Sequence, residues 1–114
     1  MCIRDSNLRA GRDKKLIAIT SGMGSTEENG GGHFVYRSSK AALNNAWKGL
    51  SMALKPDGVT CVVIHPGWVK TDMGGPSAAL EPKDSISGMR KVIAGLTLAD
   101  TGAFRRFDGG EMPW

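Results

Sequence analysis

Two side chains with complementary proton chemistry, Tyr36 and Lys40, lie four residues apart in the sequence. On a helix this spacing places both on one face, one turn from each other. A phenol is a weak acid at neutral pH, and a fixed ammonium nearby favours its ionised form. The pair could therefore give and take a proton in carbonyl–alcohol chemistry. Alone it is a weak indication, since a tyrosine closing a helical turn beside a solvated lysine has the same spacing.

A serine and a Pro-Gly turn could complete such a site. Ser21 follows the apolar run 16–19, and the Pro66-Gly67 turn follows the apolar run 59–65. If both runs are parallel strands, these residues lie at the strand ends, where α/β sheets bind ligands. The serine hydroxyl could donate to a developing alkoxide, and Thr71 could offer a hydroxyl and an N–H. Ordinary turn residues are the alternative at each of these positions.

The rest of the sequence predicts the elements that would carry these residues. Apolar runs bounded by turn residues predict strands at 16–19 and 59–65 and an edge strand within 102–107. Apolar residues at three- and four-residue spacing predict helices at about 35–54 and 82–98. The first run is nearly continuous, as in a strand buried on both faces. This order of strands and helices predicts an α/β fold with a parallel sheet.

The connections predict that the sheet is incomplete. Right-handed crossovers would place both helices on one face if the strands are added in one direction, leaving the other face bare. We therefore expect residues 7–114 to be the C-terminal part of one larger domain. Residues 1–6 show no periodicity and resemble the translation of a sequencing adaptor; a native disordered N-terminus is the alternative.

Composition narrows the class of protein further. The 114 residues include 15 Lys+Arg and 11 Asp+Glu, a net charge of +4, and 40% are hydrophobic, enough for a core. No apolar run approaches the roughly 20 residues of a membrane span. The two cysteines lack disulfide or metal-ligand patterns, so we expect a cytoplasmic protein without a metal. The basic residues are scattered and not interleaved with aromatics, so we expect no nucleic-acid partner.

Three segments together resemble a known family. Residues 17–21 (IAITS), 36–44 (YRSSKAALN) and 65–73 (HPGWVKTDM) are similar, in order and spacing, to the C-terminal half of short-chain dehydrogenases/reductases. The tail, 102–114, resembles the C-factor-like branch of carbonyl reductases. The resemblance covers nearly all of 16–114. It implies a partial Rossmann-type sheet with covering helices, and NAD(P)H-dependent reduction of a small carbonyl compound or the reverse alcohol oxidation.

The resemblance also implies a role for each matching residue. Ser21 would orient and polarise the substrate carbonyl, and Tyr36 would be the general acid. Lys40 would hold the nicotinamide ribose hydroxyls and favour the phenolate. Tyr36 and Lys40 would thus contact the cofactor as well. The other cofactor-binding residues would be Pro66, Gly67, Val69 and Thr71.

Several family features are not found in this sequence. The glycines at 22–24 and 30–32 lack the strand–glycine–helix context of a phosphate-binding loop. We therefore expect the chain alone to bind only the nicotinamide end of a dinucleotide and to have little activity. The resemblance slightly favours NADP over NAD and suggests a homodimer or homotetramer for a full-length protein. A non-catalytic, C-factor-like signalling or binding protein is the alternative.

Overall fold

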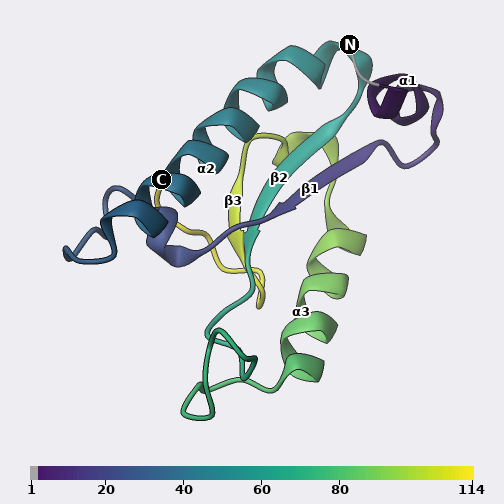
Figure 1. Ribbon diagram of the computed structural model, residues 1–114. Coiled ribbons are helices and arrows are strands. Elements are labelled where there is room, and N and C mark those ends of the chain that lie inside the picture. The colour runs from purple at the N-terminus through teal and green to yellow at the C-terminus, as the bar shows by residue number, and fades with distance from the viewer. Residues whose placement is uncertain (1–2) are drawn as a thin grey trace.

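A three-stranded parallel sheet lies between two helices, α2 (Phe34–Leu54) and α3 (Pro82–Gly95), as Figure 1 shows. The structure is a computed structural model that describes residues 3–114, with side chains from residue 6 onwards. Strands and helices alternate along the chain as the sequence predicts. The predicted α/β class, a partial Rossmann-type sheet with covering helices, is confirmed.

The strands are β1 (Lys15–Ile19), β2 (Thr60–His65) and β3 (Phe104–Arg106), in the spatial order β1-β2-β3. Strand β2 is the central one, and its residues 60–64 are all buried. Strand β1 pairs only with β2, and Ile19 at its end is 48% exposed. The prediction that the first strand is buried on both faces is therefore wrong, because β2 occupies that position. Strand β3 is an edge strand, as predicted.

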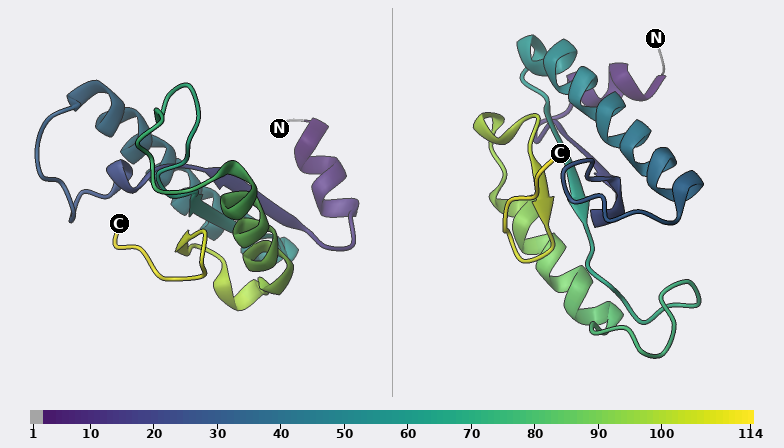
Figure 2. Two further views of the ribbon diagram at one scale, coloured as in Figure 1. Left: turned by 90° about the horizontal axis from the view of Figure 1, so that it is seen from below. Right: turned by 90° about the vertical axis from the view of Figure 1, so that its left-hand side faces the viewer.

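The two long helices cover opposite faces of the sheet. On one face, Ala18 and Val63 pack against Leu43 and Trp47 of α2. On the other, Val62 and Ile64 pack against α3 through its apolar residues Met89, Val92 and Ile93. The prediction of one covered and one bare face is therefore wrong. Figures 1 and 2 show a right-handed crossover through α2 and one of the opposite hand through α3, which the long connection 66–81 allows.

The helix boundaries differ from the predicted ones by up to three residues. Helix α2 begins at Phe34 and is followed by the 3₁₀ turn η2 (Lys55–Asp57), while α3 ends at Gly95 and not at residue 98. The next residue, Leu96, is extended and packs against Val62 and Ile64, so burial of its side chain ends the helix. A further 3₁₀ turn, η3 (Leu98–Asp100), leads into β3.

The N-terminal segment is helical from residue 3. Helix α1 (Ile3–Ala10) includes residues 3–6, where the sequence pattern indicates no element. Leu8 packs against Leu54, Val59 and Cys61, and this contact holds the helix on the molecule. Residues 1–2 lie outside the described residues, and the origin of residues 1–6 stays a prediction. No helix in the described range is long and apolar enough to cross a membrane.

Candidate active site

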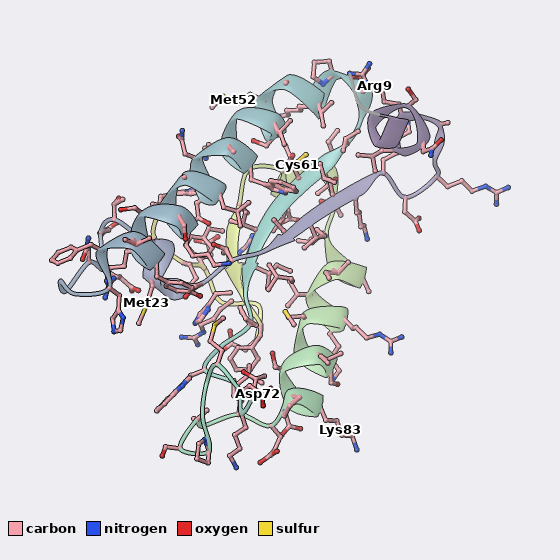
Figure 3. The ribbon with its side chains drawn as sticks, in the orientation of Figure 1. Arg9, Met23, Met52, Cys61, Asp72 and Lys83 are labelled. Carbon is pink, nitrogen blue, oxygen red and sulfur yellow. The ribbon has the colours of Figure 1, made fainter. Side chains whose placement is uncertain are left out.

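A cavity of about 940 Å³ opens at the carboxyl ends of β1 and β2. Its walls come from the 3₁₀ turn η1 (Gly22–Gly24), the start of α2, the loop 66–74 and the first turns of α3. Figure 3 shows Met23 beside the start of α2 and Asp72 in the loop after β2, at this end of the sheet. The volume is within the range of ligand-binding pockets. The sequence predicted a site at this edge.

Ser21 and Tyr36 reach the cavity from two different elements. Ser21 follows β1 and caps η1, where its Oγ accepts a hydrogen bond from the N–H of Met23 at 3.1 Å. Helix α2 runs back along the sheet from the edge where β1 ends, so Tyr36 in its first turn lies at that edge. Both side chains line the one cavity. A substrate oxygen placed between them could meet both hydroxyls.

Lys40 lies one turn further along α2 and does not line the cavity. Its Nζ is 5.7 Å from the centroid of the Tyr36 ring, within the range of a cation–π interaction. The predicted shared face of Tyr36 and Lys40 is therefore present. The lysine therefore lies over the phenol ring.

The turn after β2 requires glycine at its second position. Gly67 has φ +86°, and a Cβ atom there would lie 2.4 Å from Cδ1 of Leu80 and 3.0 Å from the Phe107 ring. The preceding carbonyl, that of Pro66, accepts a hydrogen bond of 2.6 Å from the buried hydroxyl of Ser85 at the start of α3. The Pro66-Gly67 turn is thus fixed by the side chains packed against Gly67 and by the hydrogen bond from Ser85 to Pro66.

The remaining predicted cofactor residues, Val69 and Thr71, also line the cavity. Val69 forms an isolated bridge with Leu80, which closes the loop onto itself. The Thr71 hydroxyl accepts a hydrogen bond from the N–H of Gly74 at 3.1 Å. It therefore stabilises the loop in this conformation, whereas the sequence suggested that it was available to a ligand.

His65 and Ile86 are among the cavity residues that the sequence did not predict there. The ring of His65 lies against Gly22, and its Nδ1 is buried without a partner. Burial lowers the pKa of His65 below its ordinary 6.5, and the charge of Arg106 lowers it further, while Glu28 opposes. Ile86 of α3 is 53% exposed and also lines the cavity. The only feature of the sequence that could have placed these two residues at the cavity is that His65 ends a predicted strand and Ile86 lies near the start of a predicted helix.

The cavity is mostly apolar. No Asp, Glu, Lys or Arg side chain lines it among the residues with described side chains. Three methionines contribute to its walls, Met23, Met73 and Met89, together with Trp68. Within the same part of the chain, no three His, Cys, Asp or Glu side chains gather closely enough to hold a metal ion. The wall therefore suits an uncharged ring or chain with a few polar atoms.

The fold and this site define a partial Rossmann-type α/β sheet with a cavity at its strand ends, and comparison with known proteins gives the family. The family model for short chain dehydrogenases matches residues 6–81. The chain belongs to the short-chain dehydrogenase family.

Individual relatives agree with this assignment. The chain is 48% identical to C-signal of Myxococcus xanthus over 108 residues, 94% of this chain and 65% of the relative. It is 44% identical to the carbonyl reductase Sniffer of D. melanogaster, with a TM-score of 0.85 over 88% of this chain and 41% of Sniffer. An NADPH-bound carbonyl reductase from chicken fatty liver is 42% identical, with a TM-score of 0.76 over 88% and 42%. The chain thus spans less than two thirds of each relative.

Proposed function

We propose that this chain carries the catalytic site of an NAD(P)H-dependent reductase of small carbonyl compounds, which also oxidises the alcohols in reverse. The observation that carries the proposal is that Ser21 and Tyr36, from different elements, line one cavity beside the Pro66-Gly67 turn. The similar carbonyl reductases named above support the reaction class.

The residues of the cavity fit the nicotinamide end of such a cofactor. The pyridine ring and its carboxamide are uncharged in the reduced form, and the wall beside the Pro66-Gly67 turn carries no charged side chain. Pro66, Gly67, Val69 and Thr71 would line the ring, and Tyr36 would face its ribose. Lys40 does not line the cavity, so its contact with the ribose stays a prediction from the resemblance. The bound nicotinamide would supply the hydride. NADPH is favoured over NADH because it is the cofactor in the similar chicken enzyme.

Residues of this chain would supply the proton. Ser21 donates a hydrogen bond to the substrate oxygen and holds it toward Tyr36. Tyr36 donates its proton to that oxygen as negative charge develops there. The ammonium of Lys40, 5.7 Å from the centre of the phenol ring, stabilises the phenolate that remains. The apolar wall keeps water away from this exchange.

The test is a chimera of residues 16–114 joined to the part of Sniffer that lies outside the match, which covers 41% of Sniffer. In it, Tyr36→Phe removes only the phenolic oxygen. We expect carbonyl reduction to fall by about 10²–10⁴-fold, the contribution of a positioned general acid. Ser38→Ala, which removes an exposed hydroxyl from the same helix, should leave the rate unchanged. Unchanged reduction by the Tyr36→Phe chimera would refute the proposed mechanism.

A second candidate is a non-catalytic signalling or binding protein, favoured by the 48% identity to the protein named C-signal. In that case the chimera would bind NADPH but reduce none of a panel of aldehydes and ketones. The intact set of Ser21, Tyr36 and Lys40 favours the enzyme. A cytoplasmic location and a homodimer or homotetramer stay predictions.

A further inference from the structure

The C-terminal residue contacts the loop that follows Ser21. The backbone oxygen of Trp114 accepts hydrogen bonds from the N–H groups of Thr26 at 3.0 Å and Glu27 at 3.1 Å. It also accepts from the hydroxyls of Ser25 at 3.2 Å and Thr26 at 3.1 Å. Four donors from one short loop therefore converge on a single oxygen. This cluster of contacts joins two segments 88 residues apart in the chain.

The Trp114 side chain fixes where that oxygen lies. Its indole ring is tilted against Phe104 of β3, with centroids 5.6 Å apart, and Phe104 is buried. The Nζ of Lys48 on α2 lies 4.8 Å from the centroid of a Trp114 ring. The ring thus rests between β3 and α2. Removing the ring would free the backbone oxygen to move.

A short series of hydrogen bonds leads from this contact to Ser21. The N–H of Ser25 donates to the carbonyl of Gly22 at 3.1 Å, and the N–H of Gly24 donates to the carbonyl of Ser21 at 2.9 Å. The N–H of Met23 donates to the Ser21 hydroxyl oxygen. The turn that orients the Ser21 side chain is therefore continuous with the loop held by Trp114.

The other side of the turn is closely packed, so it cannot compensate by shifting inward. A Cβ atom on Gly24 would lie 2.8 Å from Nδ2 of Asn44, which is buried on α2. A Cβ atom on Gly22 would lie 3.3 Å from Nε2 of His65. The turn rests on these two side chains from one side, and Trp114 holds its outer end.

We propose that Trp114 is a positioning residue that sets the orientation of the Ser21 hydroxyl through the loop 25–27. The functional consequence rests on the proposed role of Ser21, whereas the structural coupling does not. Trp114 touches neither the cavity nor the reacting atoms, because it is not among the cavity-lining residues. It acts through the hydrogen bonds that hold η1.

The experiment uses the ¹⁵N-labelled chimera with Sniffer, because the isolated chain is expected to self-associate. It needs no turnover, so it stays interpretable if the carbonyl reduction fails. In Trp114→Ala we expect hydrogen exchange at the N–H of Thr26 and Glu27 to become about tenfold faster, as for the loss of one net hydrogen bond. The Met23 amide shift should move toward its value in Ser21→Ala, which lacks the accepting oxygen. Trp114→Phe, which keeps an aromatic ring, should restore both.

Two further variants separate positioning from general destabilisation. Thr26→Val removes one donor to Trp114 and keeps the side-chain shape, so it should shift the Met23 amide in the same direction. Met52→Ala alters a 68% exposed side chain, which points away from the sheet in Figure 3, and should change neither signal. The proposal is overturned if the Met23 amide stays in place in Trp114→Ala and Thr26→Val, or if exchange rises equally across β1 and β2.

Discussion

His65 shows how one buried side chain can make the fold depend on pH. Its ring lies against Gly22, and burial together with the charge of Arg106 holds its pKa below 6.5. Below pH 6.5 the unfolded chain therefore binds a proton more readily than the folded one. The contribution of neutral His65 to stability is present above pH 6.5 and is lost as the pH falls from there toward its folded pKa.

Substitution of His65 should remove this dependence. For His65→Gln we expect the free energy of unfolding to fall less between pH 7.5 and pH 5 than in the unaltered chain. Urea denaturation at the two pH values measures the difference. His33→Gln, an exposed loop substitution, is the control and should keep the original dependence. An equal fall in the His65 variant would show that the histidine does not titrate differently on folding.

Gly67 provides a second residue-scale prediction, in which two glycines respond in opposite directions. Gly67→Ala must adopt φ +86°, which strains a residue with a Cβ atom, so we expect a loss of about 1–3 kcal/mol. Gly49 lies inside α2 with nothing within 4 Å of an added Cβ, so Gly49→Ala should stabilise by about 0.5–1 kcal/mol. Chemical denaturation compares them. A neutral Gly67→Ala would mean that the loop moves freely away from Leu80.

At the scale of elements, β1 and α3 are joined by a lysine. The Nζ of Lys15 donates to the carbonyls of Ile93 at 2.8 Å and Ala94 at 3.2 Å, at the C-terminal end of α3. The Ile93 carbonyl also accepts the N–H of the C-cap residue Leu96 at 3.3 Å, and the helix dipole favours a cation at this end. One side chain therefore attaches the C-terminal end of the helix to the edge strand of the sheet.

Lys15→Met should weaken this junction. We expect a loss of about 1 kcal/mol, from the two hydrogen bonds and the helix-dipole interaction together. Lys91→Met removes the same charge from an exposed position on α3 and should be nearly neutral. The free energies of unfolding of the two variants at low ionic strength are the measurement. Equal effects would mean that charge alone, and not the junction, is responsible.

At the scale of the whole molecule, the free edge of β1 determines how the 114-residue chain behaves in solution. Strand β1 pairs only with β2, and an exposed edge with an apolar residue such as Ile19, 48% exposed, favours strand-to-strand association. We expect the isolated chain to self-associate. Ile19→Lys should reduce this, because a charge at the edge opposes pairing.

Sedimentation velocity over a range of concentrations measures the effect. Met52→Lys adds the same charge at a 68% exposed position on α2, away from the edge, and should leave self-association unchanged. If the two variants behave alike, net charge governs association. A concentration-independent monomer of the unaltered chain would contradict the prediction outright.

The sequence alone predicted the three strands, the two long helices and their order, and it placed Ser21 and the Pro66-Gly67 turn at one end of the sheet. Breakers after apolar runs place Ser21 and the Pro66-Gly67 turn at strand ends, and a four-residue spacing places Lys40 beside Tyr36. These features are local, because backbone conformation and side-chain period depend on neighbours in the chain. For the same reason, the predicted boundaries of the helices and strands differ from the observed ones by only a few residues.

Only the tertiary structure decided how the elements are layered and what supports the site. Apolar residues recur at the same three- and four-residue spacing whichever face of the sheet a helix covers. The position of α3 on the face opposite α2 could therefore not be predicted. The contacts of His65 with Gly22 and of Trp114 with the loop 25–27 join distant segments, and no local pattern marks them. Such contacts arise from packing in three dimensions, because distant segments acquire a fixed distance only once the sheet has formed.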